Sequence, residues 1–266
     1  MKKEHSYAIG ATDRHQQAEK IAIACRLLAF LGLAREKTGH VSARFSELAM
    51  LLRCRGTQEA GLAFTTPDVV REMTLEGGFS DGSDQYVPPN EWPIHAAIYA
   101  ARPDVGAVVH AHPYASTVVS LCNATLKPII GAYDSSAMQL AIDGVPVYPR
   151  SILIRDARSA AELVQSIGTH DVCILRGHGI VAVGRTIEQA TLRAIRLETL
   201  ASLHLDVMKA GAVPQSIDAE DLAFWKTVKS STLGKDAQHR ENVDQWTWRH
   251  YERLLAEHEK KHHDGQ

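Results

Sequence analysis

His110 and His112 lie two residues apart at the end of the apolar run 105–112, a spacing that can serve metal chemistry. Successive side chains of a β-strand point to opposite faces, so residues two apart share a face and lie close together. Neutral imidazole nitrogens are common ligands of divalent transition metals. The pair could therefore bind one ion, although two hydrogen-bonded polar residues at a strand end would show the same spacing.

His178 is the best candidate for a third ligand, because it stands between Gly177 and Gly179. Glycines allow a tight backbone and leave the imidazole ring uncrowded. Three histidines with an open coordination position are the arrangement of catalytic zinc sites and of related manganese or cobalt sites. Such an ion acts as a Lewis acid that stabilises negative charge on a bound oxygen. The spacing does not choose among Mn²⁺, Zn²⁺ and Co²⁺.

Glu91 is the candidate acid or base. We predict a helix over residues 91–101, with Asn90 as its N-cap and Pro93 in its first turn. The positive end of the helix dipole favours the carboxylate form of Glu91, which suits a general base or a displaceable ligand. Acidic residues are also common at helix starts without any chemical role.

A second group of candidates precedes these residues in the chain. His40 and Arg44 flank Ser42 in the alternating segment 37–45, which has the pattern of a turn leading into a strand. These side chains could bind an anionic substrate, or they could lie in solvent, and their spacing does not decide between the two.

The elements that must position these residues mix helical and strand patterns. Helices are predicted over 17–33 and 115–121 and from a Thr186–Gln189 capping box to Gly211; strands are predicted within 37–45 and at 50–53, 62–65, 105–112, 172–175 and 180–183. After Pro214 the composition becomes charged and aromatic. We therefore expect a catalytic domain over residues 1–212 and a C-terminal helical extension over residues 213–266.

Composition excludes several classes of protein. The chain has 266 residues, of which 45% are hydrophobic and 23% charged, as in ordinary soluble globular proteins. Its 29 basic and 31 acidic residues leave a net charge of −2, which argues against a nucleic-acid or anionic-membrane binder. No apolar run approaches the ~18 residues of a membrane span. The four cysteines are scattered without a CxxC pair, so we expect reduced thiols and a cytoplasmic protein.

Several segments taken together resemble the class II aldolase and adducin family. They occur in the family's order and the resemblance covers roughly residues 17–211; the matching segments are 38–44, 90–99, 101–112 and 176–184. The resemblance implies a three-layer α/β/α fold with a central, mostly antiparallel sheet. It also implies a homotetramer or larger homo-oligomer with active sites at subunit interfaces.

The resemblance further implies roles for individual residues. His110, His112 and His178 match the family's metal ligands, with Mn²⁺ or Zn²⁺ as the expected ion and Co²⁺ as another candidate. Glu91 stands at the catalytic acid/base position. Tyr133 resembles the family's tyrosine acid, which a neighbouring subunit contributes.

Two departures from the sugar-phosphate aldolases bear on the substrate. Those enzymes carry a Ser-Ser pair before the glutamate, where this chain has Pro89 and Asn90, and an asparagine where this chain has His40. Both changes weaken the case for a phosphorylated sugar and suggest another anion. Three further segments resemble a decarboxylase branch whose members act on hydroxylated aromatic dicarboxylates: 53–56, 131–133 and 141–149.

From this branch we expect a metal-dependent carboxy-lyase, with 3-hydroxy-2-methylpyridine-4,5-dicarboxylate of vitamin B6 breakdown as first substrate. The alternatives are a 3,4-dihydroxyphthalate-type decarboxylase and a sugar-phosphate aldolase or epimerase. A non-catalytic, adducin-like role would predict lost ligands, yet the three histidines and Glu91 are present.

The expected chemistry places the ring hydroxyl and its adjacent carboxylate on the metal. Loss of CO₂ then needs a proton on the ring carbon, which Glu91 or Tyr133 would deliver. His40, Ser42 and Arg44 are the candidates for holding the second carboxylate, because an arginine fork matches carboxylate geometry.

Overall fold

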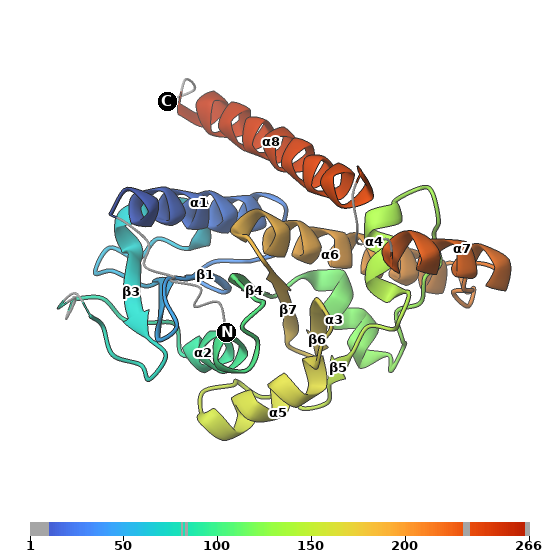
Figure 1. Cartoon of the computed structure of the whole chain (residues 1–266), viewed down its shortest axis with the longest axis horizontal. Coiled ribbons are helices and arrows are strands. Elements are labelled where there is room, and N and C mark those ends of the chain that lie inside the picture. Colours follow the sequence, from blue (N-terminus) through green and yellow to red (C-terminus); the bar gives the residue numbers. More distant parts are fainter. Residues whose placement is uncertain (1–10, 81, 83–84, 231–234, 264–266) are drawn as a thin grey trace, which may run out of the picture.

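A seven-stranded sheet runs through the middle of the computed structural model, which describes residues 11–80, 82, 85–230 and 235–263 (Figure 1). The strand order is β3-β2-β1-β4-β7-β6-β5, and all neighbours are antiparallel except β5 and β6. The strands are β1 (His40–Arg44), β2 (Ala49–Arg53), β3 (Val70–Thr74), β4 (Ala107–Ala111), β5 (Val147–Tyr148), β6 (Val172–Leu175) and β7 (Gly179–Gly184). The first ten residues of the predicted domain 1–212 lie outside the described residues.

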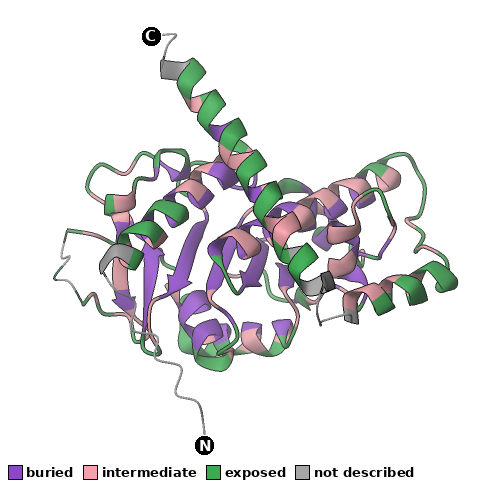
Figure 2. Ribbon diagram, turned by 45° about the horizontal axis from the view of Figure 1, so that its top comes forward, coloured by how far each residue is buried: buried purple, intermediate pink, exposed green. Residues whose placement is uncertain are grey.

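Helices cover both faces of this sheet, which confirms the expected three-layer α/β/α architecture. One face is covered by α1 (Ala11–Phe30), α3 (Tyr114–Leu121) and α6 (Ile187–Lys209), and the other by α2 (Trp92–Ala101) and α5 (Ala157–Ile167). Figure 2 shows the buried residues on the strands and on the inner sides of these helices. The remaining elements are η1 (Leu62–Phe64), η2 (Pro67–Val69), α4 (Ser135–Ala141), α7 (Ala219–Ser230) and α8 (Lys235–His263).

Alternation along the strands divides the apolar side chains between two cores. In β4, Val109 packs on the side of α1 and α6, whereas Val108 packs on the side of α2 and α5. Because side chains two apart share a face, His110 lies on the same side as Val108, toward α2 and α5. In β1, Val41 belongs to the α1 and α6 core, so its neighbour His40 also faces α2 and α5.

Side chains from the sequence set several helix boundaries. Asp156 caps α5 by accepting a hydrogen bond from the backbone N–H of Ser159, and Thr186 caps α6 by accepting one from the N–H of Gln189. The predicted capping box is only half formed, because the Gln189 side chain accepts from the N–H of Arg185, one residue before the cap.

Two predicted local features are wrong, and one strand was missed. Residues 62–65 do not form a strand; Leu62–Phe64 is the short helix η1. Asn90 does not cap α2, because Glu91 occupies the N-cap position and the helix begins at Trp92. The strand β3 was not predicted, because its central Arg71 and Glu72 hide any alternation of apolar side chains.

The described part of the chain after Pro214 consists mainly of the helices α7 and α8, as predicted. Helix α8 packs against α1 and α6, and its Trp248 and Leu255 are buried in the α1 and α6 core. Two ion pairs, each 2.8 Å long, join the same helices: Arg26 with Glu259 and Arg196 with Asp244. Among the described residues no helix is long and apolar enough to cross a membrane. The boundary between residues 212 and 213 stays a prediction.

Candidate metal centre

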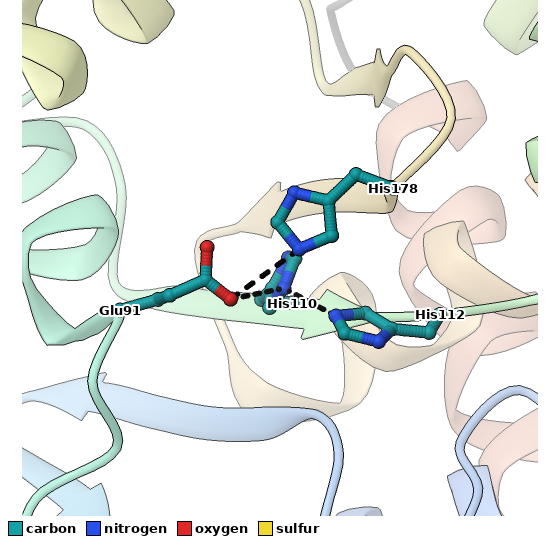
Figure 3. Close-up of side chains that lie close together, drawn as sticks. All are labelled: Glu91, His110, His112 and His178. Carbon is teal, nitrogen blue, oxygen red and sulfur yellow. Dashed lines mark hydrogen bonds and ion pairs between the residues drawn. The ribbon is translucent and has the colours of Figure 1, made fainter. Parts of the chain in front are cut away.

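The three predicted histidines and Glu91 converge on one point, as Figure 3 shows. One nitrogen of each ring and one oxygen of the carboxylate all lie within 4.8 Å of one another. His110 Nε2 is 2.9 Å from His112 Nε2. Glu91 Oε2 is 3.4 Å from His110 Nε2 and 3.3 Å from His178 Nε2.

The pairing of β4 with β7 brings the histidines together, and the glycines beside His178 make that pairing close. Gly177 has a φ of 60°, in the left-handed region that favours glycine. A Cβ on Gly179 would lie 2.3 Å from the carbonyl oxygen of Ala111 in β4, too close for any side chain. The tight backbone predicted around His178 is therefore present, and it sets the ring against the end of β4.

Backbone groups determine which nitrogen of His110 is available to a ligand. His110 Nδ1 lies 2.9 Å from the carbonyl oxygen of Ile180 in β7. Since a carbonyl only accepts, Nδ1 carries the proton and Nε2 presents its lone pair to the other candidate ligands. Metal-binding histidines are commonly oriented by such a second hydrogen bond.

His178 supplies a direct test of whether these residues fit a metal ion. Both of its ring nitrogens are buried, and neither has a hydrogen bond to another described residue. Burying a polar nitrogen without a partner costs free energy, so native proteins rarely leave one unsatisfied. A metal ion bound through Nε2 of His178 would satisfy that nitrogen. The Glu91 carboxylate, whose Oε2 lies 3.3 Å from Nε2, makes only an ion-pair contact with it.

The electrostatics of the site also suit a metal ion. Burial and the neighbouring His110 and His178 lower the pKa of His112 to about 3, so its imidazole is neutral at pH 7. A neutral imidazole is the form that binds metals. Neutral nitrogen donors with one carboxylate form a donor set for Zn²⁺, Mn²⁺ or Co²⁺. The chemistry of the residues therefore fits the predicted group of ions.

Glu91 is held by two sets of contacts. It is 6% exposed, and its Oε1 accepts a hydrogen bond of 2.8 Å from the backbone N–H of Ile154. Burial alone would raise its pKa, but the close electrostatic contacts with His110 and His178 outweigh that effect and hold the pKa well below its ordinary value. The carboxylate form predicted from the helix start is thus stabilised mainly by the histidines.

The structure brings only one of the three predicted substrate-binding residues next to the ligand candidates. His40 pairs directly with His110 across β1 and β4, and their ring centroids are 4.9 Å apart. Ser42 is fully buried. The guanidinium of Arg44 donates to three backbone carbonyls, those of Tyr99, Arg102 and Val105. Direct substrate contact by Ser42 and Arg44 stays a prediction, and their present partners are all internal.

Sequence reasoning gave no role to His95 and Tyr99, which extend the site inward. His95 Nε2 lies 2.6 Å from His40 Nδ1, and His95 Nδ1 lies 2.6 Å from Ser42 Oγ. Ser42 Oγ is also 2.7 Å from the Tyr99 hydroxyl. The available signal was the spacing of four that relates Glu91, His95 and Tyr99, which places all three on one face of a helix.

Tyr133 is not part of this buried group. Tyr133 is 79% exposed and directly precedes Asp134, the N-cap residue of α4. A role for Tyr133 in the active site of a neighbouring subunit stays a prediction.

Glu198 anchors the segment that follows His112. Its carboxylate, on α6, accepts hydrogen bonds from the backbone N–H groups of Ala115 and Ser116 at 2.7 and 2.9 Å. Helix α3 has no side-chain cap of its own, so this long-range carboxylate satisfies the free N–H groups at its start. The chain is therefore fixed shortly after His112, the ligand candidate that follows β4.

Comparisons with known proteins found matches in both sequence and fold. Residues 19–205 match the family model described as Class II Aldolase and Adducin N-terminal domain. The chain is 44% identical to a 3,4-dihydroxyphthalate decarboxylase of Arthrobacter keyseri, over 77% of this chain and 84% of that protein. It is 42% identical to one of Terrabacter sp. (strain DBF63), over 78% and 87%. An aldolase II superfamily protein from Pseudomonas syringae shares the fold, with a TM-score of 0.72 at 22% identity over 92% and 95% of the two chains.

Proposed function

The chain belongs to the class II aldolase and adducin family, and within it we propose a divalent-metal-dependent decarboxylase of 3,4-dihydroxyphthalate. The family and the decarboxylase relatives make it a carbon–carbon lyase. The observation that carries the finer proposal is the identity to these decarboxylases over most of both chains.

The relatives favour the alternative substrate of the sequence analysis over the first one. Both candidates are aromatic dicarboxylates with a hydroxyl next to the carboxylate that leaves, so the same residues would serve either. The two rings differ in the pyridine nitrogen and in a methyl group that stands where the phthalate has its second hydroxyl. We therefore assign 3,4-dihydroxyphthalate, and 3-hydroxy-2-methylpyridine-4,5-dicarboxylate is the comparison compound.

His110, His112 and His178 are the residues that would hold the ion, with Mn²⁺ or Zn²⁺ proposed and Co²⁺ as a further candidate. When bound, the ion supplies a Lewis acid that stabilises negative charge developing on a substrate oxygen. The protein's own contribution is to keep the imidazole of His112 neutral, to orient that of His110 and to bury the ring nitrogens of His178.

Glu91 is proposed to move the proton that decarboxylation requires. The bond between the ring carbon and the departing carboxylate breaks, CO₂ leaves, and a C–H bond forms at the same carbon. Glu91, ionised at rest, accepts the proton of the adjacent ring hydroxyl and returns it to the carbon. Its Oε1 stays fixed by the N–H of Ile154, which leaves Oε2 for the transfer.

His40 is proposed to hold the second carboxylate, which the product retains. Its ring lies beside His110 on the same face of the sheet. Ser42 and Arg44 are proposed to act indirectly, through their contacts with Tyr99. We further propose a homo-oligomer, in which Tyr133 of one copy would reach the site of another.

The deciding experiment removes metal with a chelator, reloads the protein with Mn²⁺ or Zn²⁺ and adds 3,4-dihydroxyphthalate. We expect equal amounts of CO₂ and 3,4-dihydroxybenzoate from the reloaded protein and none from the stripped protein. The pyridine dicarboxylate and fuculose 1-phosphate are assayed in parallel. Turnover of either compound at a higher kcat/KM would replace the proposed substrate, and equal rates with and without metal would contradict the proposed site.

A further inference from the structure

A chain of short hydrogen bonds runs from Tyr99 to His40 and ends beside the metal candidates. Its links are Tyr99 hydroxyl to Ser42 Oγ at 2.7 Å, Ser42 Oγ to His95 Nδ1 at 2.6 Å, and His95 Nε2 to His40 Nδ1 at 2.6 Å. All four side chains are buried, none more than 4% exposed.

The protons in such a chain have only two consistent arrangements. A neutral His95 carries one proton, so it donates at one nitrogen and accepts at the other. If it donates to His40 Nδ1, then it accepts from Ser42, and Ser42 accepts from Tyr99. If it donates to Ser42, then either the Ser42 or the Tyr99 hydroxyl must donate its proton outside the chain. A doubly protonated His95 would be a buried cation, and its direct partners, Ser42 and His40, carry no carboxylate.

The Tyr99 end of the chain selects between these arrangements. Burial raises the pKa of Tyr99 well above its ordinary value, so the phenol keeps its proton. Throughout the described part of the chain, Ser42 Oγ is the only acceptor within hydrogen-bond distance of that hydroxyl. The first arrangement therefore satisfies every donor, whereas the second one leaves a buried hydroxyl proton without an acceptor.

The His40 end then presents an N–H group. With Nδ1 accepting from His95, the proton of a neutral His40 must lie on Nε2. No other described residue accepts a hydrogen bond from this nitrogen, and the ring lies 4.9 Å from that of His110. A neutral N–H donor at this place attracts a carboxylate, whereas a nitrogen lone pair would repel one.

We propose that Tyr99, Ser42 and His95 are positioning residues that fix His40 in the Nε2–H tautomer, in which it donates to the retained carboxylate of the substrate. The substrate part of this inference rests on the proposed function. The tautomer part depends only on the hydrogen-bond chain, so the two can fail separately.

The tautomer of His40 is measured first, in an experiment that does not depend on turnover of substrate. Long-range proton–nitrogen NMR spectra of zinc-loaded, ¹⁵N-histidine-labelled protein distinguish Nε2–H from Nδ1–H, and the signal of His40 is the one lost in His40→Gln. We expect Nε2–H in the unchanged protein and a mixture of both tautomers in Tyr99→Phe. Tyr148→Phe is the matched control, because Tyr148 is also a buried tyrosine of the α2 and α5 core but its hydroxyl bonds Glu162. An Nδ1–H signal in the unchanged protein would overturn the proposal.

Binding is read second, with two compounds that differ by one carboxylate. 2,3-Dihydroxybenzoate keeps the hydroxyls and the reacting carboxylate of 3,4-dihydroxyphthalate but lacks the retained one. In Tyr99→Phe and Ser42→Ala we expect KM for 3,4-dihydroxyphthalate to rise up to about tenfold, as loss of one aligned hydrogen bond implies. We expect the inhibition constant of 2,3-dihydroxybenzoate to stay unchanged in both variants. An equal rise for both compounds, with metal content retained, would show a general structural effect and contradict the assigned role.

Discussion

His110 donates its Nδ1 proton to the carbonyl oxygen of Ile180 over 2.9 Å, across the strand pair β4 and β7. The sheet register thereby determines a chemical property of the side chain, since only Nε2 keeps a lone pair for a ligand. His112 and His178 reach the same point from the end of β4 and from the turn before β7. The cluster of three histidines is thus a direct product of one strand pairing.

Replacing His110 with Gln should remove the metal while leaving the sheet intact. The amide can still bond the Ile180 carbonyl, but it offers no imidazole nitrogen, so metal per chain should fall about tenfold or more after dialysis. Elemental analysis of the dialysed protein measures this ratio. His170→Gln is the control, because His170 also faces a backbone carbonyl, that of Ile167, outside the metal candidates. Full metal content in His110→Gln would contradict the assigned ligand set.

Gly179→Ala should separate β4 from β7. The new Cβ would meet the Ala111 carbonyl oxygen at 2.3 Å and the His112 ring at 3.0 Å, so backbone must move. Overpacking of this kind costs about 1–3 kcal/mol, and we expect that loss in urea unfolding together with weaker metal binding. Gly78→Ala is the control, since its nearest neighbour would be the Thr74 hydroxyl at 3.6 Å. Equal stability of the two variants would show that the strand contact is not tight.

The ligand candidates could be predicted because their pattern is local. Two histidines at strand spacing share a face whatever the rest of the fold does, and glycines on both sides of His178 report a backbone constraint. The hydrogen-bond chain from His40 to Tyr99 could not be predicted in this way. It depends on β1 pairing with β4 and on α2 lying across both, and neither relationship leaves a trace in short-range spacing.

The wrong local predictions have physical causes of the same kind. The apolar run at 62–65 has strand composition, but Gly61 precedes it with a φ of 102° and the chain turns into η1 instead. Asn90 has the residue type of a helix cap, yet its side chain accepts from Arg55 and Glu91 takes the cap position. In both cases tertiary contacts outweighed a propensity of less than about 1 kcal/mol.

Lowering the pH should destabilise the metal-free protein through His95. Burial lowers the pKa of His95 from the ordinary 6.5 to about 3, so below pH 6.5 the unfolded chain takes up a proton that the folded chain does not. The free energy of unfolding should therefore decrease as the pH is lowered from 6.5 to 3. This residue contributes a decrease of about 1.4 kcal/mol per pH unit. Urea unfolding at pH 7, 6 and 5 should show a shallower dependence in His95→Asn. The exposed His15 serves as control, because His15→Asn should keep the original slope.

Glu91→Gln should abolish turnover while the metal stays bound. The amide oxygen can still accept from the N–H of Ile154, but the side chain can no longer carry the proton, so kcat should fall by at least about 100-fold. Steady-state kinetics and elemental analysis are measured on the same sample. Glu162→Gln, which alters only contacts with Arg150, Arg158 and Tyr148 away from the ligand candidates, should keep its rate. An active Glu91→Gln enzyme would remove Glu91 from the proton transfer.

A mixture of two inactive variants tests whether a neighbouring copy supplies Tyr133. If each site combines Glu91 of one copy with Tyr133 of another, random mixed oligomers of Glu91→Gln and Tyr133→Phe contain unaltered sites. With equal amounts, half the sites keep Glu91 and half of those receive an intact Tyr133, so about one quarter of the full activity should return. The variants are co-refolded in equal amounts and assayed against each variant refolded alone. If Tyr133 acts within its own chain, every site in the mixture carries one lesion and no activity returns.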